Sequence, residues 1–325
     1  MIDRRAFVTG SVAALGAPLT AVAQQAGKVH RIGFLGGGTP AGYASHVAAL
    51  RLGLRDHGYV EGKNVTLDFR WAEGKYDRLS TLATELIGLN VDIIVTQGTP
   101  AALAAKKATT TIPVVMTIVG NPEQTGVVTS LARPGGNVTG SSFFLADLNA
   151  KRLEILKTVL PRLVRAAVLA NPGNPAMVPV LQAMEERASA LKVALWHMEV
   201  RRLDELETAF TPVKAQAEAL VMIDDGLYIS NARRIAELAL KHQLPSIGFN
   251  EYAEAGGLLA YGVNFPHMWR QSMALVDKIL KGKKPGELPI LQATRFDVVV
   301  NTKTARALGV TIPPSLLLRA DQVIE

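Results

Sequence analysis

The hydrophobic positions of the chain form short unbroken runs that alternate with stretches of helical periodicity. The stretch Arg31 to Pro40, RIGFLGGGTP, contains the apolar run 32–35, then three glycines and a threonine–proline pair. An apolar run of this length that ends at glycines and leads into a helix is typical of a strand buried in a parallel sheet. Residues 42–57 then place apolar side chains at helical spacing, and Gly58 stands where helices commonly end.

This order of strand, turn and helix continues along the chain and restarts near its middle. The segment Arg165 to Pro175, RAAVLANPGNP, repeats the plan of the first one. We predict strands at 32–35, 65–69, 91–96, 113–119, 138–143, 166–170, 193–200, 219–223, 245–249 and 258–261, and helices at 42–57, 76–89, 124–132, 153–160, 176–191, 203–215 and 230–242. The alternation predicts an α/β protein with doubly wound parallel sheets, and the restart predicts two similar Rossmann-like lobes.

The residues after 262 do not fit the repeat and predict connections between the lobes. They indicate two helices, a strand and a polar linker, at 267–280, 302–308, 295–300 and 282–289 respectively. A chain that leaves one lobe, builds the second and returns would use such pieces to join them. We therefore expect a first lobe from 28–140 plus about 263–290, a second lobe from 141–262 plus about 291–325, and a multi-strand hinge between them.

The first 23 residues have the features of an export signal. An arginine pair precedes a mildly apolar run at 8–22, and an Ala-Val-Ala sequence supplies the small residues that signal peptidase requires. The arginine pair followed by Phe7 resembles a twin-arginine signal. We predict that residues 1–23 are a signal peptide of this type and that the mature protein is periplasmic. The alternatives are the general export route and an amphipathic N-terminal helix of a cytosolic protein.

The composition excludes several kinds of site. The chain has no cysteine, which excludes disulfides, thiol nucleophiles and cysteine metal sites. The six histidines show no metal-ligand spacing, and no GxSxG or Walker motif occurs. The formal net charge is +7, but the basic residues form short clusters without interleaved aromatic residues, so we expect no nucleic-acid partner. The sequence therefore predicts no metal, no cofactor and no catalytic residues.

Polar and glycine-rich loops follow the predicted strands in both halves. In open α/β sheets, ligands bind outside the carboxyl ends of the strands. If the lobes face each other, these loops line one cleft with hydroxyls, amides, carboxylates and helix N-termini, which are the groups that a small-molecule pocket uses. The candidate ligand-binding residues are Gly38, Thr39, Gly98, Thr99, Asn121, Ser141, Ser142, Asn171, Asp224, Asn250 and Tyr261.

Several of these residues also fit roles apart from solute binding. Three of the candidates fit as helix caps: Thr39, Thr99 and Asn171. The glycines after the first strand match a dinucleotide-binding pattern, with Asp68 as a ribose acid, which would suit a nucleotide-dependent oxidoreductase. The pair Asp224-Asp225 also fits an exported α/β enzyme with acid–base chemistry. Trp71 fits either stacking on a ligand or an ordinary rim position.

Several stretches resemble a known family of transport proteins. They are IGFLGGGTP, GLRDHGYVEGKNV, RWAEGKYDRL, VDIIVTQGTPAALAAK, ARPGGNVTG, KRLEILK, EYAEAGGLLAYG and VDKILKGKKPGELP. Together, from about Val29 to Ile324, they closely match the substrate-binding components of ABC transporters related to tryptophan/tyrosine-type binding proteins. The resemblance implies the type I periplasmic-binding-protein fold with three crossover strands. It also implies an exported receptor that hands a small solute, in some members an aromatic amino acid, to a membrane permease.

We therefore predict a receptor that closes like a hinge around a small polar or amino-acid-like ligand. The ligand contacts both lobes only in the closed form, so binding favours closure. For an amino acid, we expect the carboxylate to meet Ser/Thr hydroxyls and helix N-termini. We expect the amine to meet Asp224 or Asp225.

Overall fold

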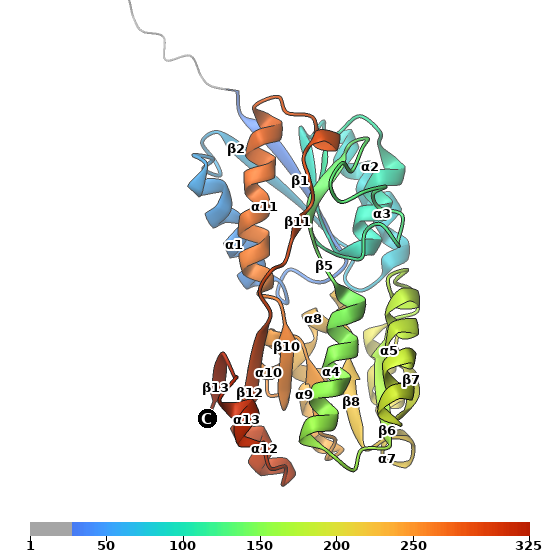
Figure 1. The fold of residues 1–325 in the computed structure, drawn as a ribbon. Coiled ribbons are helices and arrows are strands. Elements are labelled where there is room, and N and C mark those ends of the chain that lie inside the picture. Colours follow the sequence, from blue (N-terminus) through green and yellow to red (C-terminus); the bar gives the residue numbers. More distant parts are fainter. Residues whose placement is uncertain (1–27) are drawn as a thin grey trace, which may run out of the picture.

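The computed structural model describes residues 28–325, and the predicted signal peptide at 1–23 lies outside them. The described chain forms two α/β lobes, one above the other in Figure 1. Each lobe is built on one sheet with helices packed against it, and nearly all strand pairs are parallel. The predicted two-lobed α/β architecture is confirmed.

The two sheets differ in strand order and in the direction of one strand pair. Sheet A has the order β11-β5-β4-β3-β1-β2, and sheet B has the order β13-β12-β10-β9-β8-β6-β7, in which only β10 and β12 pair antiparallel. The strands of sheet A are β1 (His30–Gly36), β2 (Val65–Trp71), β3 (Ile93–Gln97), β4 (Val114–Gly120), β5 (Val138–Phe143) and β11 (Leu291–Gln292). Those of sheet B are β6 (Arg165–Ala170), β7 (Ala194–Glu199), β8 (Ala219–Met222), β9 (Ser246–Gly248), β10 (Leu259–Gly262), β12 (Asp297–Asn301) and β13 (Gln322–Ile324).

Helices connect most of the strands. In chain order they are α1 (Ala44–Asp56), α2 (Leu79–Gly88), α3 (Gly98–Ala108), α4 (Leu145–Val159), α5 (Met177–Leu191), α6 (Leu206–Phe210), α7 (Val213–Gln216), α8 (Gly226–Ser230), α9 (Ala232–Lys241), α10 (Asn250–Glu254), α11 (Phe265–Leu280), α12 (Thr302–Leu308) and α13 (Pro314–Leu317). Three short 3-10 helices are η1 (Tyr76–Arg78), η2 (Leu203–Glu205) and η3 (Pro285–Glu287). Within residues 28–325 no helix combines the length and the hydrophobicity that a bilayer span requires.

Strand β1 shows why an unbroken apolar run forms the centre of sheet A. Phe34 packs on one face of the sheet with Leu50 of α1 and Trp269 of α11. The adjacent Leu35 faces the opposite side and belongs to a separate buried cluster that includes Leu86 of α2. Because successive side chains of a strand point to opposite faces, a strand covered by helices on both sides needs apolar residues at every position.

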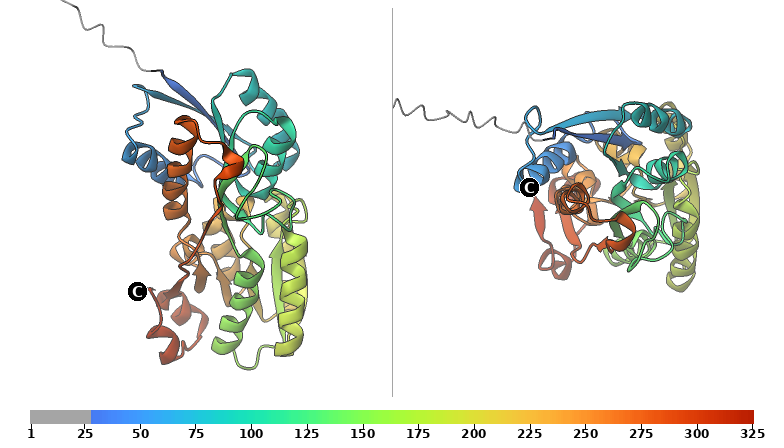
Figure 2. Two further views of the ribbon diagram at one scale, coloured as in Figure 1. Left: turned by 45° about the horizontal axis from the view of Figure 1, so that its top comes forward. Right: turned by 90° about the horizontal axis from the view of Figure 1, so that it is seen from above.

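The chain crosses between the lobes three times. It passes from β5 into α4, from β10 into α11, and from β11 into β12. Helix α11 lies beside α1 in the lobe of sheet A, as both views of Figure 2 show. The predicted lobe boundary at 140/141 falls inside β5, and the whole strand belongs to sheet A because Ser141 and Ser142 continue the ladder with β11.

Some elements differ from the sequence-based prediction. The helix expected at 203–215 is broken into η2, α6 and α7, with Pro212 before the last of them. The expected helix at 124–132 is a series of turns, in which the N–H groups of Val127 and Val128 both bond to the carbonyl of Pro122. The short helices α8 and α10 and the edge strand β13 were not predicted, because each is too short to show a period.

Candidate functional site: a pocket between the lobes

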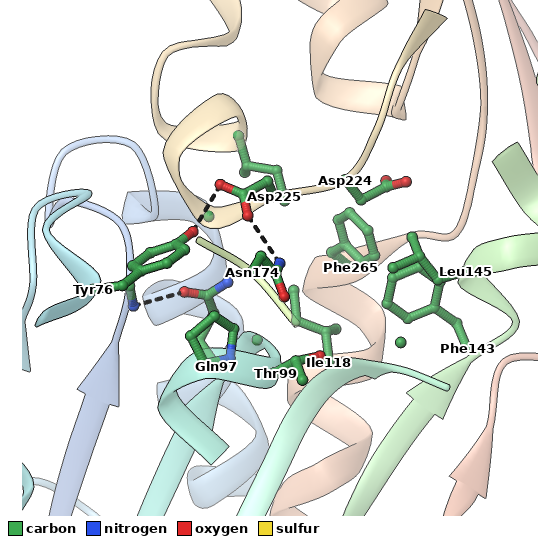
Figure 3. Close-up of a pocket in the computed structure, with 16 residues that line it drawn as sticks. Tyr76, Gln97, Thr99, Ile118, Phe143, Leu145, Asn174, Asp224, Asp225 and Phe265 are labelled. Atoms are coloured by element: carbon green, nitrogen blue, oxygen red, sulfur yellow. Dashed lines mark hydrogen bonds between the residues drawn. The ribbon is translucent and has the colours of Figure 1, made fainter. Parts of the chain in front are cut away.

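A small pocket lies where the loops of the two lobes meet (Figure 3). The lobe of sheet A contributes residues at or just after the carboxyl ends of β1, β3, β4 and β5 together with Tyr76 of η1, and the lobe of sheet B contributes Asn174, Asp224 and Asp225. These loops follow the carboxyl ends of parallel strands, which is where α/β sheets bind ligands. The cavity volume is about 30 Å³, room for about two water molecules.

The turn between β3 and α3 forms one wall of the pocket. Gly98 has a φ of 77°, a left-handed conformation that glycine adopts without strain, so β3 can pass directly into a helix. The buried Gln97 side chain accepts a hydrogen bond of 3.1 Å from the Gly37 N–H. Thr99 lies in the first turn of α3 and lines the pocket. The wall therefore offers an amide, a hydroxyl and a helix N-terminus.

Asp225 is the centre of the polar side of the pocket. It caps α8 by accepting a hydrogen bond of 3.0 Å from the Leu227 N–H, and it accepts a bond of 2.7 Å from the Tyr76 hydroxyl of the other lobe. Asn171 and Asn174 donate to it from the loop after β6 at 3.1 and 2.9 Å. Burial raises the pKa of Asp225, and these hydrogen bonds oppose that effect. Burial and the nearby Asp225 raise the pKa of Tyr76, which keeps its hydroxyl a donor.

Asp224 is engaged differently, by a buried cation. Arg152 of α4 is fully buried and forms two hydrogen bonds to the Asp224 carboxylate, at 2.6 and 3.0 Å. Its Nε also donates to the Tyr261 carbonyl at 2.8 Å. Bidentate pairing holds Asp224 rigidly and compensates its charge. Among the described residues, no cationic side chain lies within ion-pair distance of Asp225, so Asp225 is the carboxylate of this pocket without a counterion.

Apolar side chains close the end of the pocket opposite Tyr76. Figure 3 shows Phe143, Leu145 and Phe265 together on that side. The rings of Phe143 and Phe265 meet edge to face with centroids 5.5 Å apart. Ile118 of β4 lines the same region. The pocket therefore combines one uncompensated carboxylate with an aromatic and aliphatic end.

The two lobes also touch along a seam beside the pocket. The Thr39 N–H donates to the Ser230 Oγ of the other lobe at 3.0 Å, and the Tyr76–Asp225 hydrogen bond crosses the same boundary. Gly42 faces the backbone of Ser230 so closely that a Cβ atom on Gly42 would lie 2.4 Å from the Ser230 Cα. These contacts describe a closed arrangement of the lobes.

The structure brings only some of the predicted residues together. Gly98, Thr99 and Asp224 line the pocket. Gly38 and Thr39 lie at the seam, where Gly38 packs against Tyr43 and Ser230. The predicted cap role of Thr39 is also present, because its Oγ1 accepts a bond from the Gly42 N–H. Asn171 contacts the site through its hydrogen bond to Asp225.

The other predicted residues lie outside the pocket lining. Ser141 is buried against Ser272 of α11, and Ser142 accepts from Gln292 of β11. Asn121 accepts a bond from the Ala146 N–H, Asn250 donates to Asp297, and the Tyr261 ring stacks on Phe296. Both serines lie inside β5, which has the predicted bounds 138–143, so their hydroxyls belong to the sheet and hinge and not to a loop. Tyr261 lines a different depression, between α4 and the C-terminal segment.

The residues that suggested a nucleotide site or a stacking site have different partners. Asp68 forms an ion pair of 2.7 Å with Arg31 beside it on β1. Trp71 packs against Phe34, Phe69 and Tyr43, on the face of sheet A that α1 covers. This aromatic group fills the interior of the lobe and does not line the pocket.

Sequence reasoning missed several pocket residues. Tyr76, Asn174 and the apolar residues Ile118, Phe143, Leu145 and Phe265 were not candidates. Asn174 stands in the turn NPGNP, so its position after a strand was a usable signal. Arg152 had no such signal, because an arginine in a helical pattern is typical of a surface residue.

Comparisons with known proteins show which proteins this chain is similar to. The family model of the ABC transporter substrate binding protein matches residues 39–324. The "Tyrosine-binding protein" of Clostridioides difficile (strain R20291) is 27% identical over 256 residues, which cover 78% of this chain and 74% of that protein. A crystal structure of a conserved domain protein from Vibrio cholerae has a TM-score of 0.86 and 28% identity, covering 91% of this chain and 100% of that one.

A second solved structure carries a ligand. The ABC domain in complex with L-Trp from Streptococcus pneumonia has a TM-score of 0.84 and 25% identity, and the match covers 91% of this chain and 99% of that one. The two-lobed architecture of this chain is the type I periplasmic-binding-protein fold expected from the resemblance. Since the family model spans most of the described chain, we conclude that this protein belongs to the family of ABC transporter substrate-binding proteins.

Proposed function

We propose that the chain is an exported receptor that binds an amino acid with a large apolar side chain in the pocket between its lobes. The observation that carries this proposal is the pairing of Asp225, a buried carboxylate without a counterion, with an apolar end formed by Phe143, Leu145 and Phe265. A carboxylate of this kind suits an ammonium group, and the apolar end suits the side chain of the same molecule. The similarity to a tyrosine-binding protein and to a tryptophan complex supports this ligand class.

The expected orientation follows from the polar groups. The ammonium group donates to Asp225, whose Oδ2 accepts only one hydrogen bond in the structure, from Asn174. Asp224 is the less suitable partner because Arg152 already compensates it. The ligand carboxylate meets the Thr99 hydroxyl and the N-terminus of α3, where backbone N–H groups and the helix dipole favour an anion. Both ends of the ligand are thereby held by different lobes.

Binding requires movement of the lobes. A cavity of about 30 Å³ does not admit an amino acid from solution, so the lobes must part for the ligand to enter and then close again around it. We infer that the bodies which move are the lobe on sheet A and the lobe on sheet B, joined by the three crossovers. Export by the signal peptide at 1–23, a periplasmic location and delivery to a membrane permease complete the proposal.

Calorimetric titration of the mature chain tests the ligand class. L-tyrosine, L-tryptophan, L-phenylalanine and L-leucine are compared with tyramine, which lacks the carboxylate, and with 4-hydroxyphenylpropionate, which lacks the amine. We expect amino acids to bind and both analogues to bind at least tenfold more weakly, because each loses a charge-assisted hydrogen bond of about 1.5–3 kcal/mol. Binding of the amine-free acid as tightly as L-tyrosine would contradict the role of Asp225.

The variant Asp225→Asn sharpens this test. It removes the charge and keeps the size of the side chain, so we expect the affinity for L-tyrosine to fall by at least tenfold, while tyrosine analogues without an amine lose little. The matched control is Asp204→Asn, an exposed aspartate of η2 that pairs with Arg202 outside the pocket. An equal loss in both variants would contradict the proposal.

A further inference from the structure

A second buried polar cluster bridges the two lobes behind the pocket. His46 of α1, in the lobe of sheet A, has a side chain with 0% exposure, and its Nε2 lies 3.4 Å from the Glu251 Oε1 of α10, in the lobe of sheet B. The Glu251 side chain is 22% exposed, but its Oε2 is enclosed. A histidine–carboxylate pair therefore spans the boundary that must open when the ligand enters or leaves.

The surroundings of this pair are apolar. The His46 ring packs against Tyr43, Trp269 and Phe265, with centroids 4.7, 5.3 and 6.3 Å away. Within the described chain, the His46 Nε2 and the Glu251 Oε2 have no hydrogen-bond partner, and neither have the Tyr43 hydroxyl and the Trp269 indole N–H. Because aromatic rings enclose the pair, a charge in this place is costly.

We propose that His46 and Glu251 form a proton-dependent contact between the lobes, so that closure takes up a proton at mildly alkaline pH. The inference rests on the proposed hinge closure, because the two residues belong to different lobes. When the lobes part, the contact is broken and both side chains gain access to water, where they titrate at ordinary values, near 4.3 for Glu and near 6.5 for His.

The closed arrangement changes both titrations in opposite directions. Burial raises the pKa of Glu251 to about 8, with Glu254 and Asp224 adding to the effect and Arg152 opposing it. Burial lowers the pKa of His46 to about 3. Tyr43, directly before α1, also faces the pair, and burial raises its pKa well above its usual range, so it stays neutral. Between about pH 3 and pH 8 the closed pair thus holds one proton, whichever of the two residues carries it.

The sign of the pH effect follows from counting protons. In the open form the pair holds no proton above about pH 6.5, so closure takes up one between about 6.5 and 8 and weakens as the pH rises. Between about 4.3 and 6.5 both forms hold one proton, and closure is insensitive to pH. Below about 4.3 the open form holds two, so closure weakens on acidification. Ligand affinity, which depends on closure, should follow the same profile.

Two measurements test the proposal in the mature protein. Calorimetric titration with L-tyrosine at pH 5.5, 6.5, 7.3 and 8.0 should give constant affinity up to pH 6.5 and then a fall, at most tenfold per pH unit for one linked proton. Small-angle scattering without ligand should give a larger radius of gyration at pH 8.0 than at pH 6.0. The scattering arm needs no ligand, so it separates failure of this contact from failure of the proposed ligand class.

Variants assign the effect to the pair. Glu251→Gln keeps the shape and the hydrogen-bonding capacity but cannot ionise, so the fall above pH 6.5 should vanish. Glu237→Gln, an exposed glutamate of α9 in the same lobe, is the matched control and should keep the wild-type profile. The same pH dependence in Glu251→Gln and in the wild type would overturn the proposal. So would a wild-type affinity and radius of gyration that do not change between pH 6.5 and 8.0.

Discussion

Gly42 offers the sharpest test of lobe closure, because it touches the opposite lobe and lies outside the pocket lining. A Cβ atom added at Gly42 would lie 2.4 Å from the Ser230 Cα and 2.7 Å from its Cβ. The φ of Gly42 lies outside the left-handed region, so alanine suits the local backbone. The variant Gly42→Ala therefore acts as a wedge that opposes only the closed arrangement.

The size of the effect can be worked from these distances. Carbon atoms in contact are about 3.5–4.0 Å apart, so the seam must open by more than about 1 Å to admit the methyl group. An opening of that size breaks the 3.0 Å hydrogen bond from Thr39 to Ser230. Overpacking costs about 1–3 kcal/mol. If closure and binding are coupled, the affinity falls by about five- to 150-fold, since 1.4 kcal/mol is a factor of ten.

Calorimetric titration at pH 6.5 with the amino acid that binds most tightly to the wild type measures this effect. Small-angle scattering of the ligand-free variant should show a larger radius of gyration than the wild type. The control is Gly88→Ala in α2, where an added Cβ meets no heavy atom within 4 Å, so its affinity should not change. Wild-type affinity in Gly42→Ala would refute the closed seam. An equal loss in both variants would refute it as well.

Two further variants probe the buried network around the paired aspartates. Arg152→Met leaves Asp224 as an uncompensated buried charge, so the free energy of unfolding, measured by heat or denaturant, should fall by about 3–5 kcal/mol. The double variant with Asp224→Leu should recover much of this loss. Equal stability of the single variant and the wild type would contradict the buried pair. Tyr76→Phe removes the 2.7 Å hydrogen bond to Asp225 that joins the lobes, which costs about 1.5–3 kcal/mol, so ligand affinity should fall about ten- to 150-fold. Its unfolding midpoint without ligand should shift little, and unchanged affinity would show that this bond does not stabilise the closed form.

The sequence predicted the sheets well because each central parallel strand is covered on both faces. Ile94, Val95 and Thr96 of β3 are all buried, so their run of apolar and small residues could be read directly. The rule that loops follow the carboxyl ends of strands then located Gly98 and Thr99 in the pocket.

The remaining pocket residues depend on contacts that local patterns do not contain. Arg152 meets Asp224 from 72 positions away along the chain, and Tyr76 reaches Asp225 from the other lobe. Ser141 was a candidate among the loop hydroxyls although it lies within the predicted strand 138–143, and the structure places it in the ladder between β5 and the returning strand β11. Tyr261, near the end of β10, stacks on Phe296 and does not face the pocket. The face on which such a side chain lies is set by the register of the strand and not by the residue type.

Both sheets contain strands from late in the chain, which restricts when each sheet can be completed. Sheet A acquires its last strand only at residues 291–292, after most of sheet B has been synthesised, and sheet B acquires its edge only at 322–324. Phe34, near the start of the chain, packs against Trp269, which is synthesised more than two hundred residues later. The lobe of sheet A therefore cannot be completed before residue 292 is made, and any contiguous fragment that contains all of its strands also contains most of sheet B. Completion of both sheets therefore needs nearly the whole polypeptide.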